Sequence, residues 1–213
     1  TMAVWLIYTI DHLMDAAKMQ QKAITPRHVF HQTYYRELLW IWLVLFVATG
    51  FLSLAYLPIQ TIKFGMVAAI LVVVHLVLVN LLGTKISILV QKELGVAITY
   101  SAGVVVGPLS MMNTVPQYLW WVLAQLFLYA FINLLEFSYF EKEVDKKQGQ
   151  TSIARSLGAE QLAIIIYTML VLGSLINFYC LVSFPSMIVI QLVLSAMYGV
   201  LTLVFIQKHI FAA

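Results

Sequence analysis

The sequence predicts an all-α transmembrane protein, a single multi-helix bundle that comprises residues 1–213. Hydrophobic residues make up 62% of the chain and charged residues only 10%, whereas a soluble domain carries about 25% charged residues. The uncharged stretches are also as long as membrane-spanning helices, which need about 20 apolar residues to cross a bilayer core. Because the alternating pattern of a β-barrel is absent, we expect these spans to be helices.

The charged residues divide the chain into a partial first helix and six full spans. Residues 1–10 are apolar but cover only about half of a bilayer core, so we expect that sequence before them, including an N-terminal helix, is missing. The chain stops soon after Lys208, so a last helix could be missing as well. Residues 37–63 enclose one span and residues 63–85 a second, and the stretches 93–136 and 160–208 are each long enough for two. Turn-forming residues lie near the middle of these two long stretches: Gly107, Pro108 and Pro116 in the first, and Ser183 to Ser186 around Pro185 in the second.

The basic residues support this helix count, because Lys and Arg gather in the cytoplasmic loops of membrane proteins. All of them except Lys63 fall in segments that the count places on one side: Lys18, Lys22, Arg27, Arg36, Lys85, Lys92, Lys142, Lys146, Lys147, Arg155 and Lys208. We therefore expect an integral protein of the bacterial inner membrane, with this side facing the cytoplasm. Topology explains the net charge of +3, and no nucleic-acid module is predicted.

Two acidic pairs lie at the predicted cytoplasmic ends of separate helices. Asp11 and Asp15 are four residues apart, as are Glu141 and Asp145, so each pair shares one helix face. Magnesium is usually held by one or two carboxylates together with water and phosphate oxygens. The two pairs are therefore candidates to hold Mg²⁺ and, through it, a diphosphate. The alternative is that each pair is an ordinary solvated helix end.

These residues resemble the motifs of the UbiA-type intramembrane prenyltransferases, which carry two aspartate-rich motifs on cytoplasmic helix ends. In the family's first motif, Asn-Asp-x-x-Asp-x-x-x-Asp, the last two acids are matched by Asp11 and Asp15, whereas Ile7 and Tyr8 stand at the Asn-Asp positions. The second motif is matched by Glu141, Asp145, Gly149, Ser152, Ala154 and Gly158, with Glu141 where the family has Asp. The helix order resembles the second to eighth of the family's nine helices.

The resemblance implies Mg²⁺-dependent transfer of a prenyl group from a polyprenyl diphosphate to an aromatic or other lipophilic acceptor within the membrane. It implies catalytic and metal-binding roles for the four acids. Independently of the resemblance, Arg27, Lys92 and Lys142 are candidates for substrate binding, because they lie on the side of the acids and can neutralise phosphate charge. Asn133 lies two turns before Glu141 and is a further candidate, with a hydrogen bond to a neighbouring helix as the alternative. The altered motifs leave an alternative open, a non-catalytic or transport protein of the same fold that binds cations or lipid at its acidic cytoplasmic mouth.

For several other polar residues we expect structural roles first. We expect His75, Asn80 and Asn177 to bond to neighbouring helices within the membrane, and Glu136 to extend the polar cavity or cap the bundle interior. His12 lies between the first-motif acids in sequence, but we expect it to point to another face. His28 and His31 have a spacing suited to a metal, but no further thiol or imidazole completes a zinc set. Cys180 is expected to be a small core residue.

Overall fold

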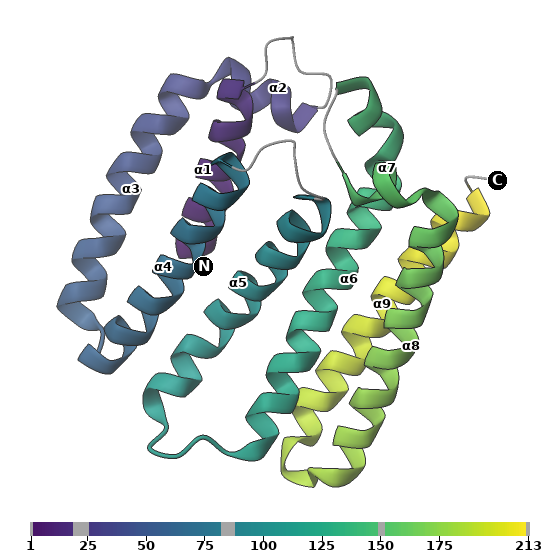
Figure 1. The fold of residues 1–213 in the computed structure, drawn as a ribbon. Coiled ribbons are helices and arrows are strands. Elements are labelled where there is room, and N and C mark those ends of the chain that lie inside the picture. The colour runs from purple at the N-terminus through teal and green to yellow at the C-terminus, as the bar shows by residue number, and fades with distance from the viewer. Residues whose placement is uncertain (1, 19–25, 82–87, 149–151, 212–213) are drawn as a thin grey trace.

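The computed structural model describes residues 2–18, 26–81, 88–148 and 152–211, and every regular element in these ranges is a helix (Figure 1). The α-helices are α1 (Met2–Lys18), α2 (Pro26–Thr33), α3 (Tyr35–Tyr56), α4 (Ile59–Leu81), α5 (Ile88–Met111), α6 (Gln117–Gln148), α7 (Ile153–Leu157), α8 (Ala159–Ser183) and α9 (Ile188–Phe211). A short 3₁₀ turn, η1 (Pro185–Met187), precedes α9. The prediction of an all-α fold is confirmed.

Six of these helices are long and apolar enough to cross a membrane, and they are the six predicted spans. The spans are residues 35–56, 59–78, 93–111, 117–143, 159–183 and 185–207. The predicted turn at Pro185 is confirmed. In the other long stretch Pro116 lies between α5 and α6, as predicted, but Gly107 and Pro108 lie within α5. There α5 continues through Pro108 to Met111, because a proline close to a helix end removes only one backbone hydrogen bond of the last turns.

The bundle is built from neighbouring antiparallel helices and has two halves: the first comprises α1 to α5, and the second comprises α6 to α9. In the first half α1 packs on α2 and α3, and α4 packs on α5; in the second half α6 contacts α7, α8 and α9. Helix α5 joins the halves by packing on α6. The carboxyl ends of α1 and α6 and the amino end of α8 all lie at the upper end in Figure 1. The helix ends predicted to face the cytoplasm therefore share one end of the bundle.

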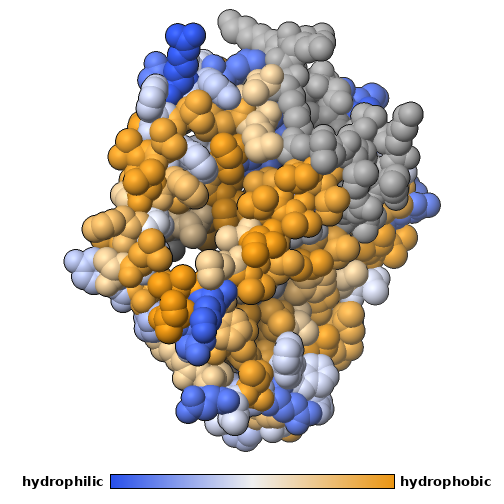
Figure 2. All heavy atoms as spheres, turned by 60° about the vertical axis from the view of Figure 1, so that its left-hand side comes forward, coloured by the Kyte–Doolittle hydropathy of each residue, from blue (hydrophilic) through white to orange (hydrophobic). Residues whose placement is uncertain are grey.

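The hydrophobic core lies in the second half and is centred on α6. Ile132 and Leu135 of α6 pack with Leu162 and Ile166 of α8 and Phe205 of α9, and all five side chains are fully buried. The outer surfaces are apolar as well. Figure 2 shows that hydrophobic residues cover most of the face turned forward there, between hydrophilic ends, and that this face is hollowed near its middle. Such a large exposed apolar surface is expected of a protein that contacts lipid.

A buried polar network ties α6, α8 and α9 together within the membrane-spanning region. The side-chain amide of Asn177 donates hydrogen bonds to Gln125 Oε1 (3.1 Å) and Gln191 Oε1 (2.9 Å). The Ser195 hydroxyl donates to Asn177 Oδ1, and the Tyr198 hydroxyl donates to the carbonyl oxygen of Gln125 (2.9 Å). The prediction that Asn177 bonds to neighbouring helices is confirmed, and Cys180 is buried in the same helix, as expected.

Candidate divalent-metal site

Helix α1 carries the first acidic pair and is held in place by contacts along one side. Leu6, Thr9, Leu13 and Ala16 recur at intervals of three or four residues and are all buried, which is the spacing of one helix face. The indole N–H of Trp42 in α3 donates a hydrogen bond to the carbonyl oxygen of Leu6 (2.8 Å). The two acids lie in the same turns of α1 as the buried Leu13 and Ala16, in the carboxyl-terminal half of the helix.

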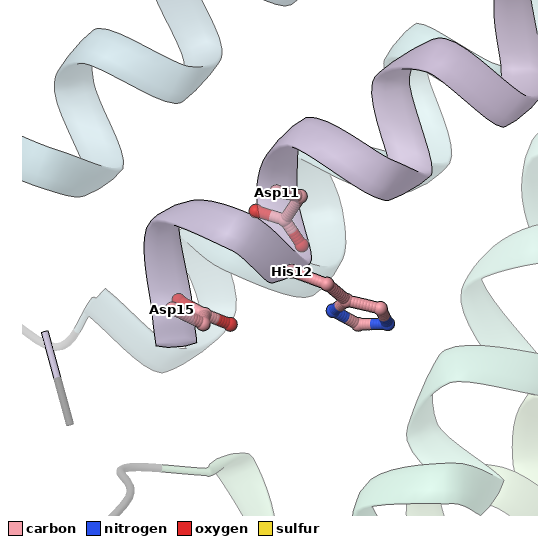
Figure 3. Close-up of side chains that lie close together, drawn as sticks. All are labelled: Asp11, His12 and Asp15. Atoms are coloured by element: carbon pink, nitrogen blue, oxygen red, sulfur yellow. The ribbon is translucent and has the colours of Figure 1, made fainter. Parts of the chain in front are cut away.

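Asp11, His12 and Asp15 form one compact group of possible metal ligands (Figure 3). One carboxylate oxygen of each aspartate and one ring nitrogen of His12 all lie within 4.8 Å of one another. Both aspartates are half-buried and His12 is buried. Two like charges this close repel each other unless a cation or a hydrogen-bond donor lies between them. The donor set therefore suits a divalent cation, which carboxylates bind well.

The expectation that His12 points to another face was wrong, because its ring nitrogen belongs to this group. Consecutive residues on a helix do point in different directions, which was the basis of that expectation. His12 and Asp15 are three residues apart, however, and side chains at that spacing are neighbours on a helix surface. This spacing is a signal that the sequence does contain.

Aromatic rings surround the imidazole of His12. The ring of Tyr8, one turn earlier in α1, lies edge-on with a centroid distance of 4.1 Å. The ring of His31 in α2 lies on another side at 5.0 Å, and Phe30 lies 5.5 Å from His31. Because α2 packs on α1, residues from two helices enclose this side chain. Tyr8 stands where the first motif of the UbiA-type prenyltransferases has an aspartate. Its ring contacts His12, the histidine that lies in one group with Asp11 and Asp15.

The second predicted motif spans the end of α6 and the short helix α7. Glu141 and Lys142 are half-buried and Glu143 is exposed, while the side chain of Asp145 and all of Gly149 lie outside the described residues. Helix α7 packs on α6, and the backbone N–H of the buried Ala154 donates to Ser138 Oγ (3.2 Å). That both acidic pairs hold the same ions stays a prediction.

Gly158, the last motif residue, separates α7 from α8 and has a clear conformational reason to be glycine. Its φ angle is +85°, in the region that residues with a Cβ atom rarely adopt. This backbone geometry lets α8 begin directly after α7. Ser152, Ala154 and Gly158 of the motif therefore lie in or directly beside α7, which packs on α6 and α8.

Of the other residues predicted to bind substrate, the structure describes the side chain of Asn133 but not those of Arg27 and Lys92. Asn133 is half-buried in α6, two turns before Glu141. Arg27 lies in α2 and Lys92 in α5, but their side chains lie outside the described residues, so their roles stay predictions. His75 packs directly against Gly95 of α5, where a Cβ atom would overlap the imidazole ring; the hydrogen bond expected between His75 and a neighbouring helix stays a prediction.

Glu136 is the most deeply buried acid among the described residues. Its side chain is 3% exposed, and its Oε1 atom has no hydrogen-bond partner in the described part of the chain. Acids within membrane-spanning helices are costly and are functional candidates by default. Glu136 precedes Glu141 by five residues, which places it about 7 Å deeper along α6 at 1.5 Å per residue. Together with Asn133, Glu136 is therefore a polar position inside the bundle on α6, the helix that carries the second motif.

A comparison of the chain with known protein families, with curated proteins and with solved structures found no match.

Proposed function

We propose that the protein is a UbiA-like prenyltransferase that moves a prenyl group from a polyprenyl diphosphate to an aromatic or other lipophilic acceptor within the membrane. The observation that supports this most is the grouping of Asp11, His12 and Asp15 at the same end of the bundle as the second acidic motif. The motif resemblance supplies the reaction class, and the six apolar helices suit two substrates that are both lipophilic.

In this proposal the acids bind the diphosphate end of the donor indirectly, through divalent cations. Asp11 and Asp15 would hold one ion on α1, and Glu141 and Asp145 would hold another on α6. Mg²⁺ at these residues would supply positive charge to the departing diphosphate. Lys142, which follows Glu141 and is half-buried, is proposed to offset the remaining phosphate charge, with Arg27 and Lys92 as further contacts.

The transfer breaks the bond between the first prenyl carbon and the diphosphate oxygen, and the bonding electrons leave with the diphosphate. The allylic cation then forms a bond to an electron-rich carbon of the acceptor, which afterwards loses a proton. The apolar walls of the bundle exclude water, which would otherwise quench the cation. Asn133 and Glu136 lie deeper along α6 than the acids and are positions from which the acceptor could be bound.

The test is diphosphate release by the purified, complete protein in detergent or nanodiscs, with prenyl diphosphates of several lengths, a panel of acceptors and Mg²⁺. Asp15→Asn and Asp145→Ala should each lower the rate by about 100-fold or more, the scale of losing one group that stabilises transition-state charge. Glu143→Gln is the matched control, because Glu143 is an exposed acid between Glu141 and Asp145; it should keep nearly full activity. Unchanged rates in both acid variants would overturn the proposal.

A further inference from the structure

The ligand group on α1 differs chemically from a set of carboxylates alone, because it contains a buried imidazole. Carboxylate, carbonyl and water oxygens suit Mg²⁺, Ca²⁺ and Mn²⁺, whereas imidazole nitrogen suits Zn²⁺, Fe²⁺ and other first-row transition ions. His12 is 8% exposed, and one of its ring nitrogens lies within 4.8 Å of an oxygen of each aspartate. A nitrogen donor so close to two carboxylates changes which ion the site prefers.

The surroundings of His12 hold the ring in this position. Tyr8 lies against it at a centroid distance of 4.1 Å with planes 73° apart, and His31 lies against it at 5.0 Å with the same interplanar angle. His31 is itself buried, at 7% exposed. Two edge-to-face contacts from different helices restrict the rotation of an imidazole, and a ligand that is already oriented loses less entropy when it binds an ion.

We infer that Asp11, His12 and Asp15 form a mixed nitrogen and oxygen site that selects a first-row transition ion such as Zn²⁺, Fe²⁺ or Co²⁺ over Mg²⁺. His12 supplies the selectivity, and the two aspartates supply the charge that any divalent cation needs. His31 and Tyr8 are positioning residues for the imidazole. The inference uses the same carboxylates as the proposed function and rests on it for the role of the site. It departs from that function only in the ion: Mg²⁺ still binds the two carboxylates, and an ion that also binds the imidazole binds more tightly.

The test is metal binding by the purified protein without any prenyl substrate. Co²⁺ is the probe, because its visible absorption reports its ligands and geometry, and Mg²⁺ affinity is measured by competition against Co²⁺. His12→Ala should weaken Co²⁺ binding by at least about 10–100-fold, because loss of a residue that only orients a ligand already costs that much, and should change the spectrum. Mg²⁺ affinity should change by less than about threefold, since its ligands are the carboxylates.

Two further variants distinguish the possible outcomes. His75→Ala removes an imidazole that packs on Gly95 in another helix pair and should leave both affinities unchanged. Asp15→Asn should weaken Co²⁺ and Mg²⁺ binding alike. The inference is overturned if His12→Ala leaves the Co²⁺ to Mg²⁺ affinity ratio as it was, including the case in which both affinities fall together. That result would overturn the inference about the ion, but the wild-type protein would still release diphosphate with Mg²⁺. The inference and the proposed function can therefore be distinguished when one of them fails.

Discussion

The two halves of the bundle bury their membrane-spanning helices to very different extents. In α6, α8 and α9 between 28% and 39% of the residues in each span are buried, against 6%, 0% and 17% in α3, α4 and α5. Polar side chains differ in the same way. Those around Asn177 in the second half form a buried network that joins three helices, whereas Asp11, His12 and Asp15 of the first half gather beside one another on a single helix. The second half therefore supplies most of the stability and also carries the second acidic motif, and the first half presents the ligand group on α1.

The largest expected difference between the halves is the response to loss of a polar group. Asn177→Leu removes the amide that donates to both Gln125 and Gln191 and leaves buried polar atoms unmatched, so it should lower the free energy of unfolding by about 1–3 kcal/mol. Asp15→Asn should leave stability unchanged or raise it, because it removes a repulsion within the acidic pair. Unfolding in mixed micelles measures both. Equal losses would contradict the division of roles.

A smaller difference is expected at two glycines that each face a ring on a neighbouring helix. A Cβ atom at Gly173 would lie 2.6 Å from Cε1 of Tyr198, whose hydroxyl is fixed by the Gln125 carbonyl. Gly173→Ala should therefore cost about 1–3 kcal/mol through overpacking. A Cβ atom at Gly95 would overlap Nδ1 of His75. That ring is only half-buried, whereas Tyr198 is buried, so we expect the His75 ring to shift more easily and the cost to be near the lower end, about 1 kcal/mol.

Gly103→Ala is the control for both glycine variants, since nothing lies within 4 Å of its Cβ position. This change should be neutral or stabilising, because alanine favours a helix over glycine by up to about 1 kcal/mol. Thermal unfolding in one detergent ranks the three variants. If Gly95→Ala costs as much as Gly173→Ala, the first half is packed more rigidly than its exposure indicates.

The spans and the shared end of the acidic motifs could be predicted, because uncharged length and basic residues report directly on the membrane. The role of Asn177 followed from the cost of an amide in an apolar span. The predicted turn at Pro108 was wrong, because α5 continues to Met111. A proline in a sequence favours a turn, but it can also lie within a membrane-spanning helix. The surroundings of His12 could not be predicted, because His31 reaches it only through the packing of α2 on α1.

The most direct test of the central claim, that the acidic groups bind a prenyl diphosphate through a divalent cation, is isothermal titration of the complete protein with both ligands. A non-hydrolysable prenyl diphosphate analogue should tighten Mg²⁺ binding, and Mg²⁺ should tighten analogue binding by the same factor, because coupling between ligands is reciprocal. We predict enhancement of about tenfold or more in the wild type and its loss in Asp15→Asn. Independent binding of the two ligands would contradict the claim and favour the non-catalytic cation or lipid binder.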